Sequence, residues 1–213
     1  MTAATSAPPF DGYAAAIAGL PCRRLDDDGH HVHLPVRRWH APAEPVMRRL
    51  LDRCHGTTLD IGCGPGRLSA ELTARGVPTL GIDTSPEAVR MTRRRGALAL
   101  TRSIFERLPG EGRWRHVLLA DGNIGINGDP VTLLRRCAGL LAPDGTILAE
   151  VDEPGTGLWR GWSRLQHPDG ESPPFAWARV GLDVLPALTA RTPLTVRSTI
   201  GCRGRWFTEL GRR

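Results

Sequence analysis

An apolar segment that runs directly into closely spaced glycines constrains this chain more than any other feature. The stretch LDIGCGPGRL, residues 59–68, carries Asp60 within its apolar segment and then glycines at positions 62, 64 and 66. Glycine has no Cβ atom, so such a segment can turn tightly and let a ligand lie against its backbone. The pattern predicts a strand, a ligand-binding turn and a helix.

A second acid, Asp83, ends the next apolar segment, PTLGID. It lies about 20 residues beyond the first glycine, the distance at which an acid accepts hydrogen bonds from ribose hydroxyls. The two features together predict a ligand that contains a nucleoside.

The glycine spacing distinguishes two classes of such ligands. Dinucleotide sites use G-x-G-x-x-G, in which the third glycine allows close packing of helix and strand. This chain has G-x-G-x-G instead, and the position of that third glycine is Arg67. Asp60 also places a negative charge where two phosphates would be unfavourable. The pattern therefore favours a ligand with an ammonium group over a nicotinamide dinucleotide, and a nicotinamide oxidoreductase is the weaker alternative.

Strand and helix signals alternate from residue 57 onward, which is typical of a parallel sheet with helices on both faces. Two helices begin with a capping residue followed by proline: Ser85 with Pro86, and Asp129 with Pro130. The predicted strands are 57–62, 78–83, 97–104, 115–126 and 146–151, and the predicted helices between them are 66–76, 85–96 and 129–141.

The segments outside this core carry weaker signals. Residues 11–20 and 42–54 are expected to be helical, and the His-rich segment 26–42 between them is expected to be a polar connection. Residues 158–181 predict two strands around a turn rich in Pro, Gly and Asp. A short helix and a C-terminal hairpin at one sheet edge, over residues 194–210, complete the chain.

Three segments, LDIGCGPGRL, GID and LLAPDGTILAEV, resemble motifs of the class I S-adenosylmethionine-dependent methyltransferases, and the resemblance covers roughly residues 45–153. It implies an α/β three-layer sandwich with a seven-stranded, mostly parallel sheet whose last strand is antiparallel. The C-terminal hairpin would supply the sixth and seventh strands. We expect one domain over residues 1–213, with a cap segment (1–44), a cofactor-binding core (45–153) and a substrate-side segment (154–213).

The resemblance also assigns a site for S-adenosylmethionine. Asp60 would face the methionine ammonium, Gly62, Cys63, Gly64 and Gly66 would pass under the ligand, and Asp83 with Thr84 would hold the ribose. The family often has an acid after the third strand to bind the adenine amine. This chain has Ser103 there, so adenine contacts would fall to the Ser103 hydroxyl, to backbone groups or to stacking by Ile104 and Phe105.

The catalytic residues are less constrained than the cofactor site. Asp121, after the fourth strand, could touch cofactor or substrate, or could cap an Asp-Gly turn. His40, beside Trp39, is the candidate general base, and its alternative is a packed surface histidine. His31 and His33 could share one face of an extended segment, but no third ligand is fixed, so no metal site is predicted.

Methyl transfer from a sulfonium is a direct displacement, so alignment of the acceptor matters more than a strong base. We expect a small-molecule acceptor, with oxygen, nitrogen, sulfur or carbon left open. The segment around Trp39 and His40 and the aromatic segment 159–177 are expected to cover the site. A protein that binds S-adenosylmethionine without turning it over, as a sensor or partner subunit, is the alternative from another class.

Composition limits which binding partners and which cellular compartment are expected for this chain. The net charge is +6, but every one of the 28 basic residues is arginine, which indicates a GC-rich bacterial genome more than a nucleic-acid partner. The 5 cysteines form no C-x-x-C pair, so we expect them to be reduced. No apolar run is long enough to span a membrane and the first residues lack a signal peptide, so a cytoplasmic protein is expected. The oligomeric state is left open.

Overall fold

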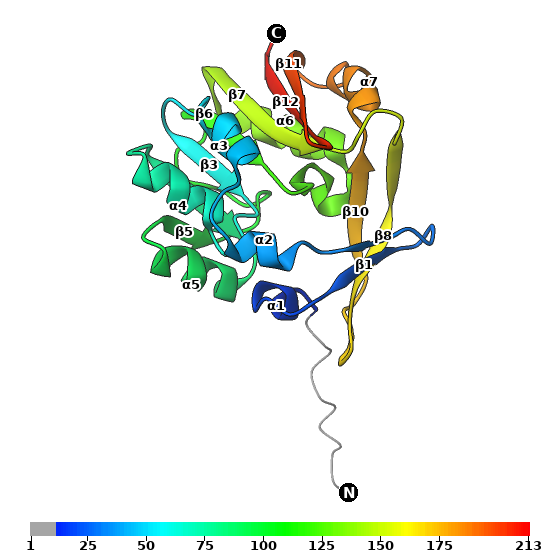
Figure 1. The fold of residues 1–213 in the computed structure, drawn as a ribbon. Helices are drawn as coiled ribbons and strands as arrows, with labels where there is room; N and C mark the ends of the chain where they lie inside the picture. Colours follow the sequence, from blue (N-terminus) through cyan, green and yellow to red (C-terminus); the bar gives the residue numbers. More distant parts are fainter. Residues whose placement is uncertain (1–11) are drawn as a thin grey trace, which may run out of the picture.

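The structure is a computed structural model that describes residues 12–213. Residue 11 of the first predicted helix lies outside the described residues, as do residues 1–11 of the N-terminal segment in which no signal peptide was expected. Figure 1 shows a large twisted sheet flanked by helices, and a smaller sheet that stands beside one end of it. In the described residues no helix is long and apolar enough to cross a membrane.

The large sheet has seven strands. In spatial order they are β11 (Leu194–Cys202), β12 (Arg205–Arg212), β7 (Leu141–Val151), β6 (Trp114–Leu119), β3 (Thr58–Ile61), β4 (Thr79–Asp83) and β5 (Leu98–Thr101). The five strands from β7 to β5 pair in parallel, whereas β12, the last strand of the chain, runs antiparallel to both of its neighbours. The predicted fold class is confirmed, and the C-terminal hairpin adds its two strands, β12 and the edge strand β11, at one end of the sheet as expected.

Helices cover both faces of this sheet (Figure 1). One face carries α3 (Pro45–Leu51), α4 (Arg67–Ala74) and α5 (Pro86–Arg94), and the other carries α6 (Pro130–Leu140) and α7 (Leu185–Thr189). Both predicted caps are present: the Ser85 hydroxyl accepts the Ala88 N–H, and the Asp129 carboxylate accepts the N–H groups of α6's first turn. Alternate residues of β6 face opposite helix layers, as a strand buried on both faces requires.

The predicted fourth and fifth strands have different ends in the structure. The fourth was expected to continue to residue 126, but β6 ends at Leu119, because Asp121 (φ 53°) and Gly122 (φ 81°) turn the chain through left-handed conformations. The 3₁₀ segment η1 (Asn123–Gly128) follows. The fifth strand begins five residues earlier than expected, at Leu141 rather than at 146.

Only two strands of the smaller sheet, here called the cap sheet, were predicted from the sequence. Its strands are β10 (Phe175–Val180), β8 (Leu158–His167), β1 (Arg23–Asp26) and β2 (His31–His33), with the short β9 (Gly170–Glu171) paired to β8. The β8–β10 pair was expected. The segment 26–42 is not the predicted polar connection, because β1 pairs with β8, β2 pairs with β1, and α2 (Val36–His40) follows.

Two shorter elements complete the described chain: α1 (Gly12–Ile17), which precedes the cap sheet, and the 3₁₀ turn η2 (Leu182–Val184) before α7. A buried carboxylate helps to fix the cap sheet. Asp26 on β1 accepts hydrogen bonds from the Ser163 hydroxyl (2.6 Å) on the adjacent β8 and from Arg179 (2.7 Å) on β10, the strand beyond it. Partners this distant in the sequence explain why β1 has no recognisable local signal.

A buried histidine at the N-terminal end of β6 makes the fold sensitive to pH. Nε2 of His116 accepts the His55 N–H (3.1 Å), so Nδ1 carries the proton that binds the Thr146 hydroxyl (3.0 Å). Burial, and then the nearby Arg115, lower the pKa of His116 below its ordinary value of 6.5. The fold therefore favours the neutral ring, and protonation would break the bond to His55.

We predict that the stabilisation from His116 is complete above about pH 6.5 and is lost as the pH falls through the lowered folded-state pKa. Urea denaturation of the wild type and of His116→Asn, at about pH 7.5 and about pH 5, measures the difference in free energy of unfolding. Titrations common to both proteins cancel in that difference. A wild-type advantage that is constant or grows toward acid would contradict the assignment.

Candidate functional site

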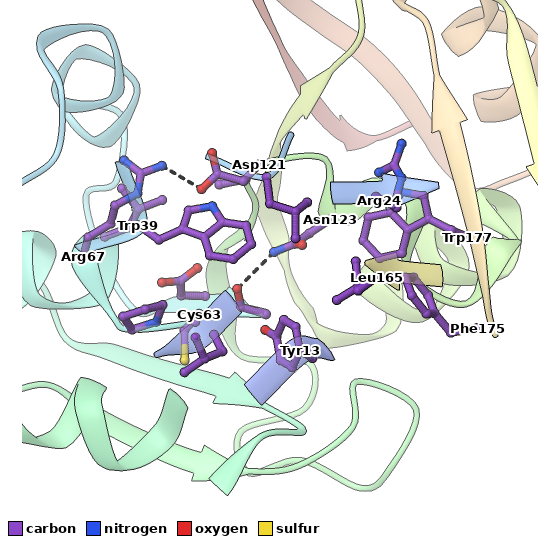
Figure 2. A pocket seen from close by; sticks show the side chains of 18 residues that line it. Tyr13, Arg24, Trp39, Cys63, Arg67, Asp121, Asn123, Leu165, Phe175 and Trp177 are labelled. Carbon is purple, nitrogen blue, oxygen red and sulfur yellow. Dashed lines mark hydrogen bonds and ion pairs between the residues drawn. The ribbon is translucent and has the colours of Figure 1, made fainter. Parts of the chain in front are cut away.

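A cleft opens at the C-terminal ends of β3, β4 and β6, where parallel sheets generally bind their ligands. It consists of two adjoining pockets that share six lining residues: Tyr13, Gly62, Asn123, Leu165, Phe175 and Trp177. The first pocket extends over the glycine turn toward α2, and the second extends past the end of β4 (Figure 2 shows the first). The cap sheet supplies the far wall of both.

The glycine turn has the backbone that its sequence requires. Gly62, Gly64 and Gly66 have φ values of 65°, 55° and 83°, which side chains with a Cβ atom rarely adopt. Each glycine meets a different neighbour. A Cβ atom at Gly62 would lie 2.6 Å from Asn123 Nδ2 and one at Gly66 would lie 2.7 Å from Thr92 Cα, whereas at Gly64 the nearest atom is 4.0 Å away. Gly64 is the glycine that leaves space in the first pocket.

Asn123 and Cys63 hold the turn from its two sides. The Asn123 amide donates to the carbonyls of Ile61 (2.8 Å) and Gly62 (3.1 Å). The Cys63 thiol lies 3.6 Å from the Thr92 hydroxyl, and burial raises its pKa far above the ordinary value. Cys63 therefore serves as a packed, protonated side chain that lines the first pocket.

Asp83, the acid predicted to bind ribose, ends β4 at the mouth of the second pocket. Its carboxylate accepts the N–H groups of Gly64 and Ser85, both at 2.9 Å, and the Tyr13 hydroxyl at 3.0 Å. Burial raises the pKa of Asp83, and these hydrogen bonds oppose that shift. The carboxylate thus ties the glycine turn to the end of β4.

Asp60 lies beneath the first pocket. It is 2% exposed and accepts the Ser69 hydroxyl at 2.7 Å. Burial raises the pKa of Asp60 to about 6, while Ser69 and the Arg67 guanidinium act in the opposite direction. A cation placed above this carboxylate would favour its charged form.

Asp121 also lines the first pocket, but its carboxylate is already surrounded by arginines. Arg67 lies at 2.7 Å, Arg38 at 2.9 Å and Arg205 at 3.4 Å. These ion pairs engage both carboxylate oxygens of Asp121, Oδ1 with Arg38 and Arg205 and Oδ2 with Arg67. The arrangement favours a role for Asp121 in positioning over a role in proton transfer.

The structure does not bring His40 to the cleft. It lines neither pocket, its ring packs beside Gly19, and its buried Nε2 has no hydrogen-bond partner in the described part of the chain. Its neighbour Trp39 does line the first pocket. The general-base role of His40 stays a prediction without geometric support.

Comparison with known proteins places these features in a family. The family described as "Methyltransferase domain" matches residues 58–145. A solved S-adenosylmethionine-dependent methyltransferase from Bacteroides fragilis, in complex with S-adenosyl-L-homocysteine, superposes with a TM-score of 0.79 at 25% identity over 95% of this chain and 94% of that one. This chain contains a class I S-adenosylmethionine-dependent methyltransferase domain. The family indicated by the three sequence motifs is confirmed.

Two curated relatives match only over the core. A trans-aconitate 2-methyltransferase of Methylobacterium radiotolerans is 32% identical over 53% of this chain and 44% of its own length. A ubiquinone biosynthesis O-methyltransferase of Xanthomonas oryzae is 30% identical over 61% of this chain and 56% of its own length. The chain therefore spans about half the length of the curated relatives it matches.

The second pocket of this methyltransferase domain gathers the residues predicted to contact adenosine. Thr84, Ser103 and Ile104 line it together with Asp83. The Ser103 hydroxyl accepts the Phe105 N–H at 3.3 Å, and its backbone N–H donates to Glu106 at 2.6 Å. Ser103 can still donate its hydroxyl proton to a ligand, because accepting one bond leaves the donor unused.

No group of three or more His, Cys, Asp or Glu side chains suited to a metal ion occurs within residues 12–213. His31 and His33 lie exposed on the edge strand β2, within the segment that was expected to be a polar connection.

Tyr13 lines the cleft although no sequence motif predicted it as a site residue. It lines both pockets and is the only tyrosine of the chain, yet it lies on a short helix 70 residues before its partner Asp83. The signal that could have found it was weak: one amphipathic aromatic residue in an otherwise alanine-rich segment. The tertiary structure brings α1 across the cleft.

The glycine turn generates one prediction. Gly64→Ala should destabilise the fold by about 1–2 kcal/mol through its positive φ and weaken binding of S-adenosylhomocysteine about tenfold, because the methyl group enters the pocket. Gly66→Ala should destabilise the fold more, since its Cβ atom also meets the backbone of Thr92. Thermal unfolding and titration calorimetry measure both effects. Normal binding by a folded Gly64→Ala variant would contradict the placement of the ligand.

Tyr13 generates a second prediction. Tyr13→Phe keeps the ring but removes the hydrogen bond to Asp83, which is worth about 0.5–1.5 kcal/mol. Amide hydrogens of residues 12–17 should therefore exchange faster, with little change in the exchange of β3 and β4. Hydrogen-exchange mass spectrometry checks this. Unaltered exchange in α1 would show that apolar contacts alone hold the helix.

Proposed function

We propose that this chain transfers the methyl group of S-adenosylmethionine to a small-molecule acceptor in the cytoplasm. The observation that carries the proposal is the continuity of the cleft. The glycine turn and Asp83 line a cofactor-sized space at the strand ends, and the same space continues under the cap sheet toward Trp39 and Trp177. A second ligand would have room beside the first.

The residues present fit the cofactor at three points. Asp83 is an anionic acceptor at the position expected for ribose hydroxyls. Asp60 supplies a buried carboxylate below the first pocket, which suits an ammonium group. Gly64 leaves a gap that a Cβ atom would fill. When bound, S-adenosylmethionine supplies an activated methyl group, and the residues of this chain align the acceptor and exclude water.

Two observations bear on the alternatives. A nicotinamide cofactor is disfavoured because Arg67 occupies the position of the third glycine and is fixed there by ion pairs with Glu44 and Asp121. A sensor that binds S-adenosylmethionine without turnover would need no second compartment, whereas the first pocket extends past the glycine turn between two walls of aromatic side chains. That extension favours an enzyme.

The acceptor is proposed to be a small molecule because the first pocket is bounded on several sides by α1, α2 and the cap sheet. The exclusive use of arginine over lysine supports an origin in a high-GC bacterium, and a role in specialised metabolism would fit a domain with an acceptor pocket of its own. Transfer of labelled methyl groups from the cofactor into fractions of a bacterial extract tests the activity. A pure binding protein would leave every fraction unlabelled.

The cofactor assignment has a direct test. Asp83→Asn should weaken S-adenosylhomocysteine binding by about 1.5–3 kcal/mol, because it removes the charge that the ribose hydroxyls meet. Some stability should also be lost, since the carboxylate accepts three protein hydrogen bonds.

Titration calorimetry measures the affinity for S-adenosylhomocysteine. Asp52→Asn is the matched control, because Asp52 is an exposed carboxylate at the C-terminal end of α3. Wild-type affinity in a folded Asp83→Asn variant would refute the ribose assignment.

A further inference from the structure

The acceptor side of the first pocket is lined by aromatic rings. Trp39 lies on one side, and Phe175 and Trp177 lie on the other (Figure 2). The rings of Phe175 and Trp177 meet edge to face, with centroids 6.0 Å apart and an interplanar angle of 84°. Aromatic residues make up only 5% of the chain, so their concentration here indicates a flat, apolar guest.

The guanidinium of Arg24, on β1, lies beside these rings, and in the described part of the chain one of its nitrogens, Nη1, is free to donate a hydrogen bond. Its Nε and Nη2 both bind the Asp26 carboxylate, at 2.9 and 3.3 Å, and its Cζ lies 5.5 Å from the Trp177 ring centroid. Within the described residues no hydrogen bond involves Nη1. The side chain is 13% exposed, so the guanidinium is held in place before any ligand binds.

The titratable groups that line this pocket are engaged elsewhere. The Asp121 carboxylate lies among three arginines, and the Tyr13 hydroxyl donates a hydrogen bond to Asp83. Asp60 lies beneath the glycine turn with Ser69, and the Cys63 thiol lies against the Thr92 hydroxyl. No lining group in the described part of the chain is therefore placed to remove a proton from an acceptor at Trp39 and Trp177. An acceptor that is already ionised needs no such group.

We propose, on the basis of the proposed function, that the acceptor is a planar, conjugated molecule that reacts through an ionised oxygen. Its ring lies between Trp39 and Trp177, and the oxygen binds Arg24. In the transfer, a lone pair of the oxygen forms the bond to the methyl carbon while the carbon–sulfur bond breaks and its electron pair returns to sulfur. The anion and the sulfonium become a neutral methyl ether or ester and a neutral thioether, and no proton is released.

The cap sheet supplies a matched control for Arg24. Arg179 also binds Asp26, at 2.7 Å, and its Cζ also lies over a tryptophan ring, 4.7 Å from the centroid of Trp159. Arg179 lines neither pocket. Loss of either arginine removes one of the two cations that neutralise Asp26, but only loss of Arg24 removes a donor from the acceptor side.

The first experiment uses 4-nitrophenol, whose ionised form absorbs visible light, with protein saturated with S-adenosylhomocysteine. We expect the wild type to bind the probe as its anion below the pH at which the free probe ionises. Arg24→Gln should weaken this binding about tenfold, or about 1.4 kcal/mol, and abolish the shift in ionisation. Arg179→Gln should leave both unchanged. Arg24→Lys keeps a positive charge beside Asp26 and replaces the glutamine variant if that one does not fold.

The second experiment measures transfer of the labelled methyl group to three probes: 4-nitrophenol, 4-nitroaniline and cyclohexanecarboxylate. The second probe has the ring without an acidic oxygen, and the third has the anion without a planar ring. We expect methylation of 4-nitrophenol alone, with a rate that falls in Arg24→Gln and persists in Arg179→Gln.

Several outcomes would overturn the inference: equal use of 4-nitroaniline or cyclohexanecarboxylate, equal losses in the two arginine variants, or no binding of 4-nitrophenol by protein that binds S-adenosylhomocysteine. A matching loss of S-adenosylhomocysteine affinity in Arg24→Gln would assign Arg24 to the cofactor carboxylate instead. Failure of the wild type to bind S-adenosylhomocysteine at all would refute the proposed function itself, which calorimetry distinguishes from the other results.

Discussion

The carboxylate of Asp83 joins three parts of the molecule that the ligand site needs at once. It accepts the N–H of Gly64 from the glycine turn, the N–H of Ser85 at the start of α5, and the hydroxyl of Tyr13 from α1. A buried carboxylate is costly unless donors surround it, so these contacts are mutually dependent. This one group therefore links the glycine turn, the start of α5 and the helix α1 that covers the cleft.

A second set of charges fixes the opposite end of the cleft. Arg67, only 3% exposed at its side chain, pairs with Glu44 ahead of α3 and with Asp121 after β6. Arg205 on β12 pairs with Glu150 at the end of β7 and approaches the same Asp121. Breaking one partner of such a buried network leaves the others unpaired, which is strongly destabilising. The network thereby holds α2 and α3 against the sheet.

The cap sheet gives the cleft its second wall, and it is built from segments far apart in the chain. Asp26 of β1 meets Ser163 of β8 across 137 residues of sequence. β10, which carries Phe175 and Trp177, pairs with the other edge of β8. An aromatic wall opposite the glycine turn lets one pocket receive both a cofactor and an acceptor, and it removes the acceptor from bulk water.

Local chemistry was enough to predict the glycine turn, the capped helices at Ser85 and Asp129, the strands around Asp60 and Asp83, and the C-terminal hairpin. Periodicity, caps and turn residues act over a few positions, so they can be identified without a fold. Four features became visible only in the folded chain: the His-rich segment joins a second sheet, Tyr13 reaches Asp83, arginines enclose Asp121, and His40 lies outside the cleft. Those outcomes depend on partners tens of residues away, whose pairing is set by burial and charge compensation in the assembled fold rather than by any local pattern.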